Sequence, residues 1–282
     1  MEGLYINSSS QNQRYDHNYT TSKYQNNEYL KKLYFIRDVV TYIVVAVGLP
    51  LTLVAIYALY SMVRRDHVAP IYLINLLITD VLQFCCMIVR VAPNVDKKIN
   101  FIFIFIYLSA LFASVFFMVC ISLERYLVIA HPLWYRCRRT IKTSVVLCVL
   151  VWVLSAVCGF LNFFIERVVR YILFTILLPP FPLLIFSLVG TLKALSASIS
   201  VPSDEKRRIV GILVLVLLIY TLLFLPSIIW LLEENSENLD FLSTIFIRLS
   251  PLADTFLYVF MRKGSIDKLL ASVCCCRMDN FM

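Results

Sequence analysis

The sequence predicts an all-α membrane protein, a seven-transmembrane helix bundle with a short amphipathic C-terminal helix. The chain is 60% hydrophobic and 16% charged, with a mean hydropathy of +0.81, whereas a soluble domain is about half apolar and about a quarter charged. Seven apolar runs each reach the length of about 20 residues that a helix needs to cross a bilayer. Backbone amides inside hydrocarbon must bond within their own segment, so each run is expected to be a helix. A water-soluble globule is therefore excluded.

The seven predicted spans follow one another without an internal repeat or a separate soluble domain. Prolines at positions 50, 182, 226 and 251 fall inside spans, where membrane helices tolerate them as kinks. The spans are expected at Val39–Met62, Val68–Val91, Phe101–Ile129, Thr143–Phe164, Tyr171–Leu195, Ile209–Leu232 and Phe241–Met261.

The distribution of Lys and Arg predicts an external N-terminus. In that orientation the inner side holds 14 Lys and Arg against 5 Asp and Glu, and the outer side holds 11 against 10. Cytoplasmic loops carry such an excess of bases, and it accounts for the net charge of +8 without a nucleic-acid partner. We therefore expect a multi-pass plasma-membrane protein with an extracellular tail over 1–36, the bundle over 37–262, and a cytoplasmic amphipathic helix and tail over 263–282.

Both tails carry candidate modification sites. Asn7 and Asn18 each begin an Asn-x-Ser/Thr triplet, which favours glycosylation of an external tail. The run Cys274, Cys275 and Cys276 follows a basic helix and favours S-palmitoylation at the inner leaflet. The alternatives are chance triplets in an Asn-rich tail, and cysteines tolerated in a reducing compartment.

Ionisable residues inside the predicted spans are the strongest functional signal. An ionisable group in hydrocarbon is costly and is usually paired or functional. Asp80 lies in the second span, Glu124 and Arg125 at the end of the third, and Arg248 and Asp254 in the seventh. The alternative, packing or solvation at the end of a span, explains Asp80 least, because Asp80 has apolar neighbours on both sides.

Short motifs on six of the seven spans resemble those of class A (rhodopsin-like) G-protein-coupled receptors. The order of the motifs along the chain carries the resemblance, since each alone is short. They are the stretch Asn75 to Asp80, the triplet Glu124-Arg125-Tyr126, Trp152, Pro182, Pro226, and the stretch Asp254 to Tyr258, which looks like a degraded NPxxY motif. The stretch Leu133 to Arg139 and the very short loop between the fourth and fifth spans look most like Mas-related receptors.

The resemblance implies a two-state switch that couples to a heterotrimeric G protein. In this family Glu124 would hold Arg125 at rest, and Arg125 would engage the G protein when helix six swings outward. Asp80 and Asp254 would lie near a central water and sodium site, and Tyr258 would swing inward. Two states that differ by a few kcal/mol can be shifted by a ligand with differential affinity.

Several positions depart from the family pattern. Thr52 replaces the helix-one asparagine, Gly190 the helix-five tyrosine, Phe224 the helix-six tryptophan and Thr255 the helix-seven proline. The cysteine that normally tops helix three would fall near Asn100, so the usual external disulfide is not expected. Mas-related receptors also lack that tryptophan and that disulfide arrangement. These changes keep a second function open, a non-signalling seven-helix scavenger or regulatory receptor.

Arginines near the outer halves of the helices suggest an anionic ligand. By the resemblance Arg248 faces the ligand pocket, Arg90 and Arg170 approach it, and Tyr107 stands where amine receptors carry an aspartate. Guanidinium groups bind carboxylate or phosphate bidentately. The alternative is that Arg248 pairs internally while the other two reach the membrane surface.

Other classes of protein find less support in the sequence. A transporter is expected to show repeats or paired broken helices, and the chain shows neither. The spans contain no nucleophile–base set or metal cluster, so no catalytic residue, no cofactor and no metal other than sodium is expected. The expected partners are a heterotrimeric G protein, an extracellular ligand and membrane lipids.

Overall fold

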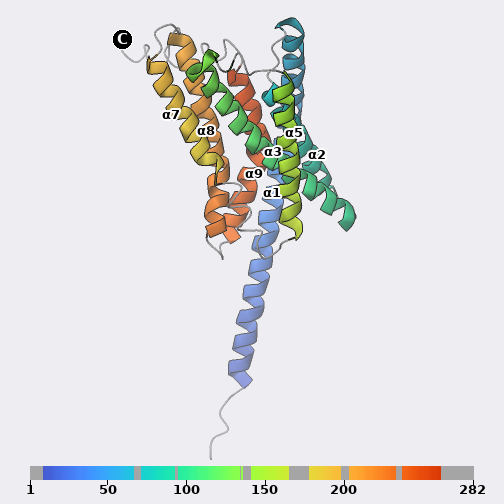
Figure 1. The fold of residues 1–282 in the computed structure, drawn as a ribbon. Coiled ribbons are helices and arrows are strands. Elements are labelled where there is room, and N and C mark those ends of the chain that lie inside the picture. Colours follow the sequence, from blue (N-terminus) through green and yellow to red (C-terminus); the bar gives the residue numbers. More distant parts are fainter. Residues whose placement is uncertain are drawn as a thin grey trace, which may run out of the picture. The chain divides into compact units, whose positions relative to one another are not determined.

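The computed structural model is helical in almost all of the chain that it describes, residues 9–66, 71–92, 95–133, 135, 141–164, 178–197, 203–232 and 237–261. Seven helices lie in these ranges (Figure 1). They are α1 (Ser9–Asp66), α2 (Ile71–Val91), α3 (Lys97–Ala130), α5 (Ile141–Phe164), α7 (Pro180–Ala197), α8 (Ser203–Leu232) and α9 (Glu237–Met261).

The helices confirm the predicted seven-helix membrane fold. Each predicted span overlaps one helix, and five helices, α1, α2, α3, α5 and α8, contain a stretch long and apolar enough to cross a membrane. The apolar part of α7 is shorter, Pro180–Ser196. Helix α9 carries Arg248 and Asp254 within its apolar stretch. The chain is a multi-pass membrane protein.

Two predictions meet the structure only in part. The fifth span was expected from Tyr171, but the described helix begins at Pro180, and residues 165–177 lie outside the described part. Pro182 consequently lies in the first turn of α7, where the missing amide hydrogen costs nothing, and not within a continuous helix. The predicted amphipathic helix and tail, residues 263–282, lie outside the described residues.

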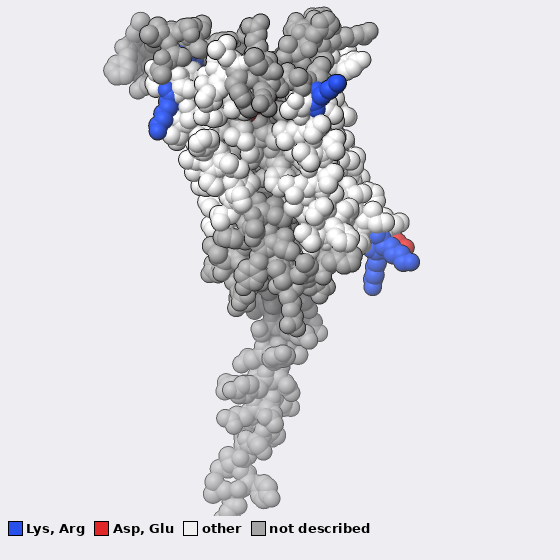
Figure 2. All heavy atoms as spheres, viewed as in Figure 1, with Lys and Arg blue, Asp and Glu red and all other residues white. Residues whose placement is uncertain are grey.

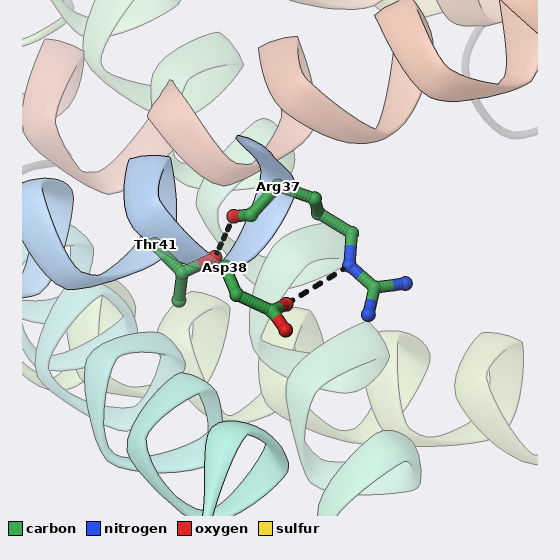
Figure 3. Close-up of polar contacts among 3 residues, drawn as sticks. All are labelled: Arg37, Asp38 and Thr41. Carbon is green, nitrogen blue, oxygen red and sulfur yellow. Dashed lines mark hydrogen bonds and ion pairs between the residues drawn. The ribbon is translucent and has the colours of Figure 1, made fainter. Parts of the chain in front are cut away.

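The chain divides into two compact units, residues 1–41 and 42–282, and the side-chain contacts described near the end of the first unit are local. The Thr41 hydroxyl donates to the Arg37 carbonyl at 2.7 Å, and the Arg37 Nε pairs with the Asp38 carboxylate at 3.2 Å (Figure 3). The Arg37 guanidinium also lies 4.8 Å from the centre of the Tyr34 ring. These partners are at most four residues apart, so they stabilise the helix itself.

Helix α3 is the central helix of the second unit, residues 42–282. It packs against α2, α5, α7 and α8, while α9 packs against α2 and α8 (Figure 1). The core side chains Leu76, Phe117 and Phe224 have no exposed surface. They belong to α2, α3 and α8, so this core joins three helices that are distant in sequence.

Apolar side chains also cover the outside of the second unit. Val149, Val153 and Phe160 of α5 are each more than half exposed. On the face that Figure 2 shows, Lys and Arg lie towards the ends of the described bundle and an uncharged band separates them. Contiguous exposed apolar surface is rare on soluble monomers, so the lipid bilayer is the environment that this surface fits.

A glycine of α1 leaves room for an aromatic ring of α2. A Cβ atom at Gly48 would clash with the ring of Phe84, which has no exposed surface and cannot move aside easily. By contrast, a Cβ atom at Gly211 of α8 would meet nothing within 4 Å. Small residues at helix contacts are the usual means of close packing in membranes.

We predict that Gly48→Ala destabilises the bundle and that Gly211→Ala does not. Both changes make the same helix-favouring substitution, but only the first forces the core to shift, at a cost of about 1–3 kcal/mol. Thermal unfolding of the two purified variants in the same detergent measures the difference. Equal melting temperatures would show that α1 does not pack against Phe84 as described.

Candidate functional site

Two carboxyl groups meet in the middle of the bundle. Asp80 of α2 and Asp254 of α9 have no exposed surface, and their side chains interact directly. Within the described residues, none of their four carboxyl oxygens has a hydrogen-bond donor. Two adjacent carboxylates are unstable in a dry interior if both are ionised and bare. Either one of them binds a proton, or a cation binds between them. The structure thus brings together the two acids that the sequence singled out in separate spans.

A pair of hydroxyl groups joins α1 to α9 beside these acids. The oxygens of Thr52 and Thr255 lie 2.6 Å apart, and both side chains are buried. Thr255 donates its proton to the Pro251 carbonyl at 3.0 Å, so Thr52 is the donor in the bond between the two threonines. Thr52 and Thr255 are the two positions at which the chain departs from the family asparagine and proline. Together the two replacements form a new interhelical bond.

The C-terminal end of α3 is tied to the residues that follow it. The Tyr135 hydroxyl donates to Glu124 at 2.5 Å, and the Tyr135 amide bonds to the His131 carbonyl at 2.9 Å. Glu124 and its neighbour Arg125 are partly buried. Sequence analysis missed Tyr135 as a site residue and noted it only within the stretch that resembles Mas-related receptors.

Tyr126, the third residue of the Glu-Arg-Tyr triplet, packs onto α7. Its ring lies edge-on to Phe186 with ring centres 5.5 Å apart. A Cβ atom at Gly190 would lie 2.5 Å from the Tyr126 ring, so only glycine leaves space for it there. The position where the family has a tyrosine on helix five therefore accommodates a tyrosine from helix three.

Two further motif residues meet between α2 and α5. The Trp152 indole donates to the Asn75 side-chain oxygen at 3.0 Å, and the Asn75 amide donates to the Ile71 carbonyl at 2.9 Å. Trp152 also lies edge-on to Phe117, with ring centres 6.1 Å apart. This bond fixes the positions of α2 and α5 on either side of α3.

The remaining predicted switch residues lie on α8 and α9. Phe224 is fully buried and stacks on Tyr220 at 5.0 Å between ring centres, and Pro226 lies inside α8 one half-turn later. Tyr258 is almost buried. It lines, together with Thr255, a pocket of about 250 Å³ between α1 and α9.

At the predicted outer end of the bundle, two arginines converge on one tyrosine. The Arg90 guanidinium lies 5.7 Å from the centre of the Tyr107 ring, and Arg248, which is 4% exposed, interacts electrostatically with the same side chain. Within the described residues the Tyr107 hydroxyl has no hydrogen-bond partner, and neither polar atom of buried Gln83 has one. Buried polar atoms of this kind normally bind water or a ligand.

Some predicted sites cannot be placed. Asn7, Arg170 and the cysteines Cys274, Cys275 and Cys276 lie outside the described residues. Only the backbone is described for Asn18, within α1.

Comparisons with known proteins identify the class of molecule. Residues 51–171 match the rhodopsin family of 7-transmembrane receptors. The chain is 27% identical over 260 residues to G-protein coupled receptor 68 of Mus musculus, covering 77% of this chain and 71% of the relative. It is 28% identical over 241 residues to mouse Mas-related G-protein coupled receptor member B3 (76% and 72%), and 36% identical over 124 residues to Mas-related G-protein coupled receptor member X3 of Macaca mulatta (42% and 37%).

The fold is that of a helical, multi-pass membrane protein, and the comparisons place its similarity among membrane receptors. Over residues 51–171 the chain is similar to the rhodopsin-like, class A family of G-protein-coupled receptors, and its likeness to Mas-related receptors agrees with the local resemblance in its sequence. Receptors of this family are not enzymes.

We predict that the hydroxyls of Thr52 and Thr255 stabilise the bundle as a pair. Each of Thr52→Val and Thr255→Val is expected to lower stability, and the double variant to lose less than the sum, with a coupling of about 0.6 kcal/mol, the average for such bonds in membranes. Unfolding of the four proteins in one detergent measures the coupling.

Thr221→Val is the matched control for this cycle. The Thr221 hydroxyl bonds only to the Leu217 carbonyl of its own helix in the described contacts, at 2.7 Å. Its combination with Thr52→Val should be additive. A coupling of zero between Thr52 and Thr255 would contradict the bond.

Proposed function

We propose that the chain is a plasma-membrane receptor that transmits the binding of an extracellular, anionic ligand to heterotrimeric G proteins. The proposal places the N-terminus outside, the tail at residues 1–36 outside and residues 263–282 in the cytoplasm. The observation that carries it is the convergence of polar groups at three depths of one bundle, at Tyr107, at Asp80 and at Glu124. Such groups are costly in hydrocarbon unless they serve binding or switching.

At the inner depth, Arg125 is the residue proposed to meet the G protein. Its neighbour Glu124 is held by Tyr135, and Tyr126 is seated against Gly190. A movement of α3 or α7 that disturbs these contacts would change how Arg125 is presented. The exposure of Arg125 to a G protein would therefore depend on the positions of α3 and α7.

At the middle depth, Asp80 and Asp254 fit a sodium ion. Sodium is a hard cation that prefers oxygen ligands, and the carboxyl oxygens of this pair have no donor among the described residues. Sodium bound there would supply the positive charge that the two carboxylates need. The threonine bond to α1 and residues Phe224, Pro226 and Tyr258 are the proposed moving parts around it.

At the outer depth, Arg90, Tyr107 and Arg248 are proposed to hold the ligand. Two guanidinium groups next to one phenol attract a carboxylate or a phosphate, and charge-assisted bonds to them are among the strongest that proteins form. Gln83, one to two turns below Arg90 on α2, adds a donor and an acceptor. The candidate ligands are an acidic lipid, a nucleotide, a small carboxylate and an acidic peptide.

The first prediction concerns Arg125. Arg125→Ala is expected to lower G-protein activation by at least about tenfold while surface expression stays normal, because a charge-assisted contact is worth about 1.5–3 kcal/mol. The measurement is a cellular activation panel covering the G-protein classes. Lys142→Ala, which removes an exposed inner cation at the start of α5, is the control. A parent chain that activates no class would favour the non-signalling scavenger or regulatory receptor.

The second prediction concerns Arg248. In cells exposed to panels of fatty acids, nucleotides, dicarboxylates and acidic peptides, Arg248→Gln should weaken the response to an active anion by about 10- to 100-fold. Lys98→Gln, which removes an exposed cation in the first turn of α3, should leave the potency unchanged. Equal potency in Arg248→Gln and the parent would rule out a ligand anchored by this arginine.

A further inference from the structure

A groove runs between the ends of α7 and α8 that the charge distribution places at the cytoplasmic face. Its volume is about 550 Å³, and its walls come from the last turns of α7 and the first turns of α8. The two helices pack side by side (Figure 1). None of its lining residues belongs to the acid pair, to the residues around Tyr107 or to the Glu124-Arg125-Tyr126 triplet, which carry the proposed receptor function.

Most of the groove is aliphatic and open to the side of the bundle. Leu192 and Val214 are 45% and 37% exposed, and Val210 also lines the groove. Gly211 leaves the floor open, because a Cβ atom there would meet nothing within 4 Å. A hydrocarbon chain lying along these residues would be in contact with apolar atoms over its length.

The other end of the groove is cationic. Lys206 and Arg207 both line it. The Lys206 ammonium donates to the Leu195 carbonyl near the end of α7 at 3.0 Å, so its charge is fixed across the two helices. Arg207 is exposed, and its planar guanidinium suits a phosphate group. The charge of this end is therefore anchored by the fold and faces the groove.

From this combination we infer that the groove binds an anionic phospholipid of the inner leaflet. The two cations match a negatively charged headgroup, and the aliphatic wall matches an acyl chain. A soluble phosphate would leave the aliphatic wall unused, and a neutral lipid would offer no negative charge to Lys206 and Arg207. The occupant is thus a lipid with both parts, such as phosphatidylserine, and it would bridge α7 and α8.

The test is competition between two lipids on the intact, purified chain. The receptor in detergent is given phosphatidylserine and phosphatidylcholine with the same acyl chains, and native mass spectrometry measures which lipid stays bound. The parent should prefer phosphatidylserine. Since a base near a membrane surface contributes about fivefold to binding an anionic lipid, the double variant Lys206→Gln, Arg207→Gln should lose about thirty-fold of that preference.

Single variants keep the test decisive if the double variant is unstable. Arg207→Gln removes only an exposed charge and should lose about fivefold of the preference, whereas Arg207→Lys should keep most of it. Lys142→Gln, which removes a cation outside the groove, should match the parent. Gly211→Leu should fill the floor and lower retention of both lipids, and Gly211→Ala should do so much less.

Three outcomes would overturn the inference. One is equal retention of the two lipids by the parent. Another is an Arg207→Gln variant that behaves as the parent does. The third is displacement of the lipid by inorganic phosphate alone, which would indicate a soluble anion site. None of these outcomes depends on whether the chain activates a G protein, so the lipid site and the proposed function can fail separately.

Discussion

Two carboxyl groups from different helices, Asp80 of α2 and Asp254 of α9, meet at the centre of the bundle with no exposed surface. A low-dielectric interior does not tolerate two bare charges side by side, so a proton or a cation has to be held there. Whatever holds the pair together also holds α2 against α9. The bond between Thr52 and Thr255 lies next to Asp254 in sequence and adds α1 to the same junction. Loss or gain of a proton or cation at the acid pair would therefore act on contacts of α1, α2 and α9.

Three positions that depart from the family pattern make contacts between helices. Thr52 and Thr255 replace an asparagine and a proline, and they bond to each other instead. Gly190 replaces a tyrosine, and its missing side chain leaves the space that Tyr126 occupies. In both cases the residues present make a contact between two helices. The first contact is a polar bond between α1 and α9, and the second is aromatic packing of α3 on α7.

Hydropathy predicted the spans because a bilayer imposes a minimum length on each helix, and it placed Asp80 and Asp254 because charge inside a span is conspicuous. The approach of Arg90, Tyr107 and Arg248 to one region was expected from the family resemblance and not from hydropathy. The Thr52–Thr255 bond was not, since it joins residues 203 positions apart whose hydroxyls give no hydropathy signal. From the sequence, Gly190 indicated only a missing tyrosine side chain, because the Tyr126 ring that fills this space belongs to another helix. Tyr135 was not predicted as a site residue, because it lies outside the predicted spans and a single tyrosine there carries no hydropathy signal.

The most direct test of the acid pair as a switch is nucleotide exchange by the purified chain. The receptor is reconstituted in vesicles with each class of heterotrimer, and exchange is measured in sodium and in a larger monovalent cation at equal ionic strength. The parent should stimulate exchange above empty vesicles, and sodium should lower it. Asp80→Asn should exchange equally in both salts. An identical sodium response in parent and variant would contradict the role of the pair, and no exchange with any heterotrimer would contradict the receptor function itself.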